Sequence, residues 1–191
     1  LEFRRVLFRS WCSISPSNMN TNGHYLILST RKPRGFAVLD PSGAELGRLA
    51  QTSWFRQDAK GMVDGQLVEV TPEGFWKNRY AIRVDGAPFG TIANKHWGCL
   101  SLTLLNEHRQ PVELKFGRLS FWKGCFALRL DKDLILLEVK PRFNWQRFDT
   151  DFEVSLRGTG IASAQLPLLV ALSGYCARLV RQRQSAAAAA G

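Results

Sequence analysis

The chain has 191 residues, of which 45% are hydrophobic and 22% charged, and its formal net charge is +10. This length fits one domain, and the composition excludes an intrinsically disordered chain because it supplies enough apolar residues for a core. The basic balance is compatible with nucleic acid, with anionic lipid, or with a merely cationic surface. The cysteines Cys12, Cys99, Cys125 and Cys176 are widely spaced without a CxxC motif. This pattern predicts reduced, buried thiols in a cytosolic protein.

The N-terminal segment differs from the rest of the chain. Residues 1–10 (LEFRRVLFRS) have neither strand alternation nor helix caps, and we interpret them as translated sequencing adapter. Residues 11–18 are interpreted as translated upstream sequence, with Met19 as the true start. The alternative is that all 191 residues are native. From Met19 onward no charged segment precedes a long apolar run, so we expect no signal peptide and a cytoplasmic protein.

Short strand signals separated by turns fill the middle of the chain. Asp40–Gly43 reads as a four-residue turn, and Asp85–Gly86 as a two-residue hairpin turn. About eleven strands are predicted from this pattern. They cover residues 24–29, 36–40, 44–49, 62–70, 75–84, 87–92, 99–105, 112–116, 118–130, 134–140 and 151–156.

A single apolar helix is predicted at Leu166–Val180, LPLLVALSGYCARLV. A helix that is apolar nearly all round must be surrounded by protein or by lipid. Its fifteen residues rise about 22 Å, which is short of a hydrocarbon core of about 30 Å. We therefore expect a core helix inside a β-structure. The rival interpretation is a membrane tail anchor flanked by Arg178, Arg181 and Arg183.

The order of these elements resembles the tubby C-terminal-like superfamily, which includes LURP-one-related proteins and phospholipid scramblases. The resemblance lies in the hairpins at Phe36–Leu49 and Ala81–Ile92 and in W-x-x-F-D-x-D-F-E-V at Trp145–Val154, followed by a Gly-containing linker and the terminal helix. It implies an all-β fold with one core helix, a closed antiparallel barrel of about twelve strands around that helix. This domain would cover residues 19–184, leaving 185–191 as an Ala-rich tail. The runner-up is a β-sandwich with the helix outside.

Basic residues cluster in three places, which suggests contact with an anionic surface. Lys and Arg near a membrane contribute about 1 kcal/mol each. The resemblance favours lipid, because tubby itself binds phosphoinositides; the alternative is scattered solubilising charge. The predicted lipid- or anion-binding residues are Arg31, Lys32, Arg34, Lys140, Arg142 and Arg147, and the third cluster is Arg178, Arg181 and Arg183.

Three acidic residues, Asp149, Asp151 and Glu153, alternate and would share one face of a strand. Together they have the oxygen ligands that calcium prefers. Scramblases place an acidic calcium-associated segment in a similar position, but most of its acidic residues are missing here. The favoured interpretation is a solvated strand face balanced by arginines such as Arg142, Arg147 or Arg157, with no metal bound.

Aromatic residues lie among lysines and arginines and have the character of base-stacking platforms. We favour core packing for them, since no RNA-binding signature accompanies them. They are Trp54, Phe55, Phe75, Trp76, Trp97, Phe121, Trp122, Phe143 and Trp145.

Catalytic motifs are nearly absent from the sequence. His24, His96 and His108 are far apart, and there is no G-x-S-x-G elbow, phosphate loop or G-x-G-x-x-G. Cys99 lies near His96, but on an extended segment the two face away from each other. We expect no enzyme and no cofactor, but a binding or scaffold module that associates peripherally with anionic phospholipid. The alternatives are a small nucleic-acid-binding barrel, which is disfavoured, and a scramblase-like membrane-anchored protein. The oligomeric state stays open.

Overall fold

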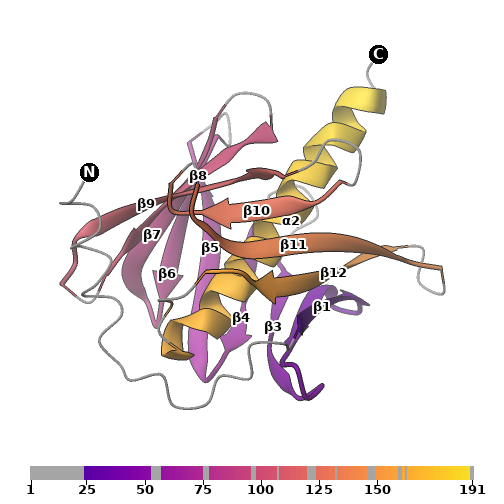
Figure 1. The fold of residues 1–191 in the computed structure, drawn as a ribbon, viewed down its shortest axis with the longest axis horizontal. Helices are drawn as coiled ribbons and strands as arrows, with labels where there is room; N and C mark the ends of the chain where they lie inside the picture. The colour runs from indigo at the N-terminus through magenta and orange to yellow at the C-terminus, as the bar shows by residue number, and fades with distance from the viewer. Residues whose placement is uncertain are drawn as a thin grey trace.

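The computed structural model describes residues 24–52, 57–74, 78–95, 98–106, 108–119, 124–131, 133–145, 149–158, 161 and 163–189. In these ranges twelve antiparallel strands close into a barrel, and one α-helix runs through it (Figure 1). The predicted closed barrel around a C-terminal helix is thereby confirmed.

The elements follow one another along the chain with short connections. They are β1 (His24–Arg31), β2 (Arg34–Leu39), β3 (Glu45–Gln51), β4 (Ala59–Val63), β5 (Gln66–Glu73), β6 (Arg79–Val84), β7 (Ala87–Asn94), β8 (Leu100–Leu105), β9 (Pro111–Arg118), β10 (Phe126–Arg129), β11 (Ile135–Asn144), β12 (Asp149–Leu156), the 3₁₀ turn η2 (Ser163–Gln165) and α2 (Leu166–Ala189).

Each strand pairs with its neighbours in sequence, and β1 pairs with β12 to close the barrel. Odd-numbered strands therefore all end at one mouth of the barrel, and even-numbered strands at the other. Because α2 follows β12, it begins where the even-numbered strands end and emerges where the odd-numbered strands end. We call these two ends the N-mouth and the C-mouth, after the ends of α2 that lie there.

Two predicted strands are wrong: residues 118–130 contain the last residue of β9 and the whole of β10, and residues 62–70 contain the end of β4 and the start of β5. β4 and β5 turn at Asp64–Gly65, where φ is 49° and 74°. The predicted turn at Asp85–Gly86 has the same form, with φ of 51° and 79°. Both are the left-handed pair that a two-residue hairpin requires. Asp64–Gly65 is also an Asp-Gly turn signal, but the apolar residues alternate on both sides of it, so the segment resembles one continuous strand.

The core lies between the inner face of the barrel and α2. From Leu166 to Val180 every residue of the helix is buried except Arg178. The largest fully buried side chains come from strands all round the barrel: Ile27, Leu49, Tyr80, Ile82, Ile92, Leu100, Leu102, Leu104, Phe116, Phe126 and Phe152. At Gly174 a methyl group would come within 2.6 Å of Ile27 Cδ1, so the missing side chain lets α2 approach β1 closely.

The helix is longer than predicted and continues from Val180 to Ala189. Its last turns are rich in Arg, Gln and Ala, which are good helix formers. A stretch over Ser163–Ala186 is long and apolar enough to cross a membrane, but 78% of its most apolar window is buried inside the protein. As expected from the sequence, this helix is a core element.

Removing α2 tests its role as core. We expect deletion of residues 166–191 to leave an aggregating chain, because several buried Leu-sized groups are lost together and each contributes about 2–5 kcal/mol. Deletion of 185–191 alone is the control and should leave a folded protein. A soluble monomer lacking 166–191, with cooperative urea unfolding, would contradict a core role.

One buried polar group of α2, the Ser173 hydroxyl, leads to a variant that we expect to be more stable than wild type. Ser173 is fully buried, and its Oγ has no hydrogen-bond partner in the described part of the chain. We expect Ser173→Ala to raise the free energy of unfolding by about 1 kcal/mol, since it removes an unpaired hydroxyl and places a better helix former there. Leu172→Ala, one residue away and equally buried, should lower it by about 2–5 kcal/mol. Urea unfolding measures both; a loss of stability in Ser173→Ala would show that the hydroxyl has a partner.

Candidate functional site

The barrel opens along one seam at the C-mouth. The β1–β12 pairing runs from His24↔Ser155 to Ile27↔Phe152. Beyond this point β1 continues to Arg31 paired with β2, while β11 and β12 continue as a separate pair to Asn144↔Asp149. We call these extensions the β1–β2 ribbon (residues 28–37) and the β11–β12 ribbon (residues 141–152). Figure 1 shows the latter extending past the body of the barrel.

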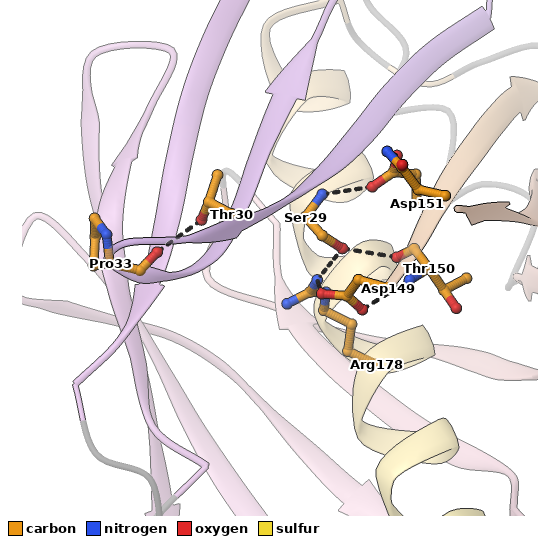
Figure 2. A network of polar contacts seen from close by, with 8 residues as sticks. Ser29, Thr30, Pro33, Asp149, Thr150, Asp151 and Arg178 are labelled. Atoms are coloured by element: carbon orange, nitrogen blue, oxygen red, sulfur yellow. Dashed lines mark hydrogen bonds and ion pairs between the residues drawn. The ribbon is translucent and has the colours of Figure 1, made fainter. Parts of the chain in front are cut away.

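Arg178 of α2 fills the opening between the two ribbons (Figure 2). Its Nη2 donates a hydrogen bond to Ser29 Oγ and lies 3.5 Å from Asp149 Oδ2. The guanidinium carbon lies 5.4 Å from the centre of the Phe36 ring, within the range of a cation–π contact. Only 14% of the side chain is exposed. The C-terminal end of the core helix is thus tied to both ribbons.

The surroundings of Arg178 act on its charge in opposite directions. Burial lowers the pKa of the Arg178 guanidinium, and the neighbouring Arg34 lowers it further. The carboxylates of Asp149 and Asp151 oppose this shift. An arginine remains charged under these conditions. The centre of the seam therefore carries a fixed, mostly desolvated positive charge.

Asp151 supplies a side-chain hydrogen bond at the point where the backbone ladder between β1 and β12 has ended. Its Oδ1 accepts a hydrogen bond of 2.7 Å from the Ser29 backbone N–H, and its Oδ2 accepts one of 2.8 Å from Asn144 Nδ2. Ser29 Oγ donates to the Thr150 carbonyl oxygen at 2.9 Å (Figure 2). Buried backbone groups need such partners, so Asp151 has a structural role in the seam.

The alternating carboxylates do not gather into a metal site. Asp149 faces Arg178 and Asp151 bonds to Ser29, whereas Glu153 lies 3.5 Å from His24 Nδ1 and 3.4 Å from Arg142 Nη1. In the ranges that the structure describes, no group of three acidic, histidine or cysteine residues could hold a metal ion. Because β1 and β12 separate here, Asp151 accepts a hydrogen bond from the Ser29 backbone and does not join Asp149 and Glu153 in a shared metal site.

All three basic clusters lie toward the C-mouth. Arg31, Lys32 and Arg34 form the exposed tip of the β1–β2 ribbon, on the same mouth as the arginines of α2. Lys140 and Arg142 lie on β11 where it leads into the β11–β12 ribbon, with Lys140 Nζ 3.8 Å from Glu138 and Arg142 Nη1 3.4 Å from Glu153. Arg147 lies outside the described residues.

Charge is divided between the two mouths. Among the described residues, the basic side chains at the ends of the C-mouth strands, in their connections and ribbons and at the end of α2 are Arg31, Lys32, Arg34, Lys60, Arg79, Lys95, Arg118, Arg142, Arg178, Arg181 and Arg183, against the acidic Asp58, Glu73, Asp149 and Asp151. At the N-mouth the acidic residues are Asp40, Glu45, Asp64, Asp85, Asp131 and Asp133, against the basic Arg83, Arg109, Arg129 and Arg157. In the described part of the chain, the barrel is thus basic at one end and acidic at the other.

The prediction that the aromatic residues pack in the core is wrong for Phe143 and Trp145. These side chains are 51% and 75% exposed on the β11–β12 ribbon. The other aromatic residues named from the sequence lie outside the described residues. In the sequence they follow the ends of β3, β5, β7 and β9: Trp54, Phe55, Phe75, Trp76, Trp97, Phe121 and Trp122.

In the part of the chain that the structure describes, buried side chains of the strands and α2 form the core of the barrel, and two hollows lie toward its ends. At the C-mouth a cavity of about 10 Å³ between α2 and β2–β4 has room for about one water molecule. Tyr175 closes it by donating a 2.6 Å hydrogen bond to the Gln57 carbonyl oxygen. A larger open hollow of about 330 Å³ lies at the N-mouth, lined by Ala87, Pro88, Phe89, Leu105, Asn106, Arg109 and Gln165.

The residues considered for catalysis are dispersed. His24 Nδ1 lies 2.9 Å from Ser155 Oγ on the outside of the barrel. The prediction of buried thiols is wrong for Cys99, which is exposed, whereas Cys125 is buried. Cys176 is buried in the core, where burial raises the pKa of its thiol. His96 lies outside the described residues. The described histidines and cysteines thus form no nucleophile–base pair.

Comparisons with known proteins give a likeness of fold alone. No family model matches the chain, and no curated protein matches it. A solved structure, that of a protein from Arabidopsis thaliana (AT5G01750), superimposes with a TM-score of 0.50 at 12% sequence identity. The match covers 86% of this chain and 93% of the Arabidopsis chain.

The seam makes a prediction about Asp151. We expect Asp151→Ala to lower the free energy of unfolding by about 1–3 kcal/mol, because it removes the carboxylate that accepts a hydrogen bond from the buried Ser29 N–H. Asp151→Asn should cost less, since its amide oxygen can still accept from Ser29. Glu73→Ala is the control: that carboxylate is exposed at the end of β5, and its loss should change the free energy of unfolding by well under about 1 kcal/mol. Equal urea midpoints for Asp151→Ala and wild type would contradict a structural role.

Proposed function

We propose that this chain is a non-catalytic binding module that associates with anionic phospholipid surfaces through its C-mouth. The observation that carries the proposal is the division of charge between the two mouths. A basic C-mouth is attracted to an anionic surface, while the acidic N-mouth is repelled by it. The two ends together favour one orientation, with the barrel standing on its C-mouth.

The residues best suited to contact headgroups differ from the full set that the sequence suggested. Arg31, Lys32 and Arg34 lie at the exposed tip of a ribbon, and Arg181 is exposed at the end of the barrel. Lys140 and Arg142 lie on β11 where it leads into the β11–β12 ribbon, each with a carboxylate close by. At about 1 kcal/mol for each Lys or Arg near the surface, a few exposed cations suffice for reversible binding.

The shape of the C-mouth supports a lipid surface over nucleic acid. A membrane is a plane, and the tips of the β1–β2 and β11–β12 ribbons lie at the same end of the barrel as the C-terminal end of α2, so they can meet a plane together. Single-stranded nucleic acid is bound along a basic groove with stacking platforms, whereas the described hollow between α2 and β2–β4 has room for only about one water molecule. The sequence resemblance to the tubby C-terminal-like superfamily points in the same direction. A scramblase-like anchor is less favoured, because the helix it requires is buried in the barrel.

Vesicle sedimentation tests the proposal. We expect the protein to bind phosphatidylcholine vesicles containing phosphatidylserine, to bind pure phosphatidylcholine weakly, and to dissociate as salt rises, because surface charge is screened within about 10 Å at 0.1 M salt. Arg31→Glu/Lys32→Glu should weaken binding by about 30-fold, from two lost contributions of about 1 kcal/mol each.

A matched control removes the same charge elsewhere. Arg109→Glu/Lys115→Glu changes the net charge equally, but at the N-mouth and on the outer face of β9, and should leave vesicle binding nearly unchanged. If both double variants lost vesicle affinity equally, binding would depend on net charge alone, and this would contradict binding through the C-mouth. Binding that ignores salt, or retardation of DNA or RNA in place of vesicles, would overturn the proposal.

A further inference from the structure

The tip of the β11–β12 ribbon carries an unusually exposed aromatic pair. Trp145 is 75% exposed and Phe143 51%, the highest values among the large apolar side chains that the structure describes. Residues of this size usually lie in cores or at interfaces, where they contribute most of the contact area. Exposed to water they offer no stability to the barrel.

The two rings form one apolar unit. Phe143 and Trp145 are two residues apart and so share one side of the strand, with their ring centres 4.8 Å apart and their planes at 81°. The last paired position of the ribbon is Asn144↔Asp149, so Trp145 begins the connection at its tip. Arg142 alternates with this pair and is itself 64% exposed.

The charge around this pair indicates what covers it. The ribbon leaves the C-mouth, beside the basic tip that carries Arg31, Lys32 and Arg34. A surface that meets both must offer negative charge next to an apolar layer. An anionic lipid bilayer has this arrangement, and Trp is enriched at the level where headgroups meet acyl chains. A stable protein–protein contact needs about 800 Å² from each partner, which two side chains do not supply.

We propose that Phe143 and Trp145 insert into the headgroup–acyl boundary of an anionic membrane, while the basic C-mouth holds the headgroups. This inference rests on the function proposed above and adds a second component to it. The basic residues supply the part of the affinity that salt weakens. The aromatic pair supplies a part that salt leaves unchanged, because apolar burial does not depend on screening.

The test uses the full chain with Phe143→Ala/Trp145→Ala and phosphatidylcholine–phosphatidylserine vesicles. We expect affinity to fall about tenfold or more, as for the loss of one or two partly buried aromatic groups, while the slope of affinity against salt stays that of wild type. The maximum surface pressure at which the protein enters a lipid monolayer should also fall. Arg31→Glu/Lys32→Glu should show the opposite pattern. The dependence of its affinity on salt should be weaker than in wild type, while its binding at high salt should equal that of wild type.

The matched control is Met62→Ala/Leu134→Ala, which removes exposed apolar side chains at the N-mouth (49% and 39% exposed). It should bind vesicles and enter monolayers as wild type does. Urea unfolding checks that all variants keep the wild-type midpoint, as expected for side chains outside the core.

The outcomes separate the two proposals. Wild-type protein that binds anionic vesicles, with an aromatic variant that binds equally well and enters monolayers equally, would overturn insertion and leave the C-mouth proposal standing. Wild-type protein that binds neither vesicle would overturn both. Concentration-dependent dimers of wild type on gel filtration, lost in the aromatic variant, would show that a second copy covers the pair and would also overturn insertion.

Discussion

The structure depends on the mutual burial of α2 and the inner face of the barrel. A closed sheet of this size needs side chains to fill its interior, and a helix that is apolar all round needs to be surrounded. Each element supplies what the other lacks. Their fit is close enough that a single methyl group at Gly174 would meet Ile27. The only charged side chain between Leu166 and Val180 is Arg178, at the point where the helix leaves the barrel.

The same helix gives the barrel its two unlike ends. Since α2 starts at the N-mouth and runs the length of the barrel, its terminal arginines must lie at the C-mouth. There Arg178 meets the carboxylate of Asp149 and the ring of Phe36, while Arg181 is exposed beyond the barrel. The element that fills the core thus also adds positive charge to the surface proposed to meet a membrane.

The sequence allowed the barrel and helix to be predicted, because strand alternation and an all-round apolar helix are strong local patterns. The polarity of the barrel was not predictable, because assigning a connection to a mouth requires counting strands without error. Reading residues 62–70 as one strand, across Asp64–Gly65, reverses the mouth of every later connection. The exposure of Trp145 and the separation of Asp151 from Glu153 depend on where β1 leaves β12, which no local pattern marks.

The open seam explains how two ribbons can leave a closed barrel without exposing unsatisfied backbone. Where the β1–β12 ladder stops, Asp151 accepts from the Ser29 N–H, and Ser29 Oγ reaches the Thr150 carbonyl oxygen. These side-chain hydrogen bonds satisfy backbone groups where the strand ladder has ended. The strands can therefore separate there, and Arg178 lies in the opening between them. A fully paired seam would hold β1 against β12 along its whole length. Because β1 and β12 separate, the basic tip of the β1–β2 ribbon and the aromatic tip of the β11–β12 ribbon lie apart. In the proposed orientation the first contacts lipid headgroups and the second contacts the boundary between headgroups and acyl chains.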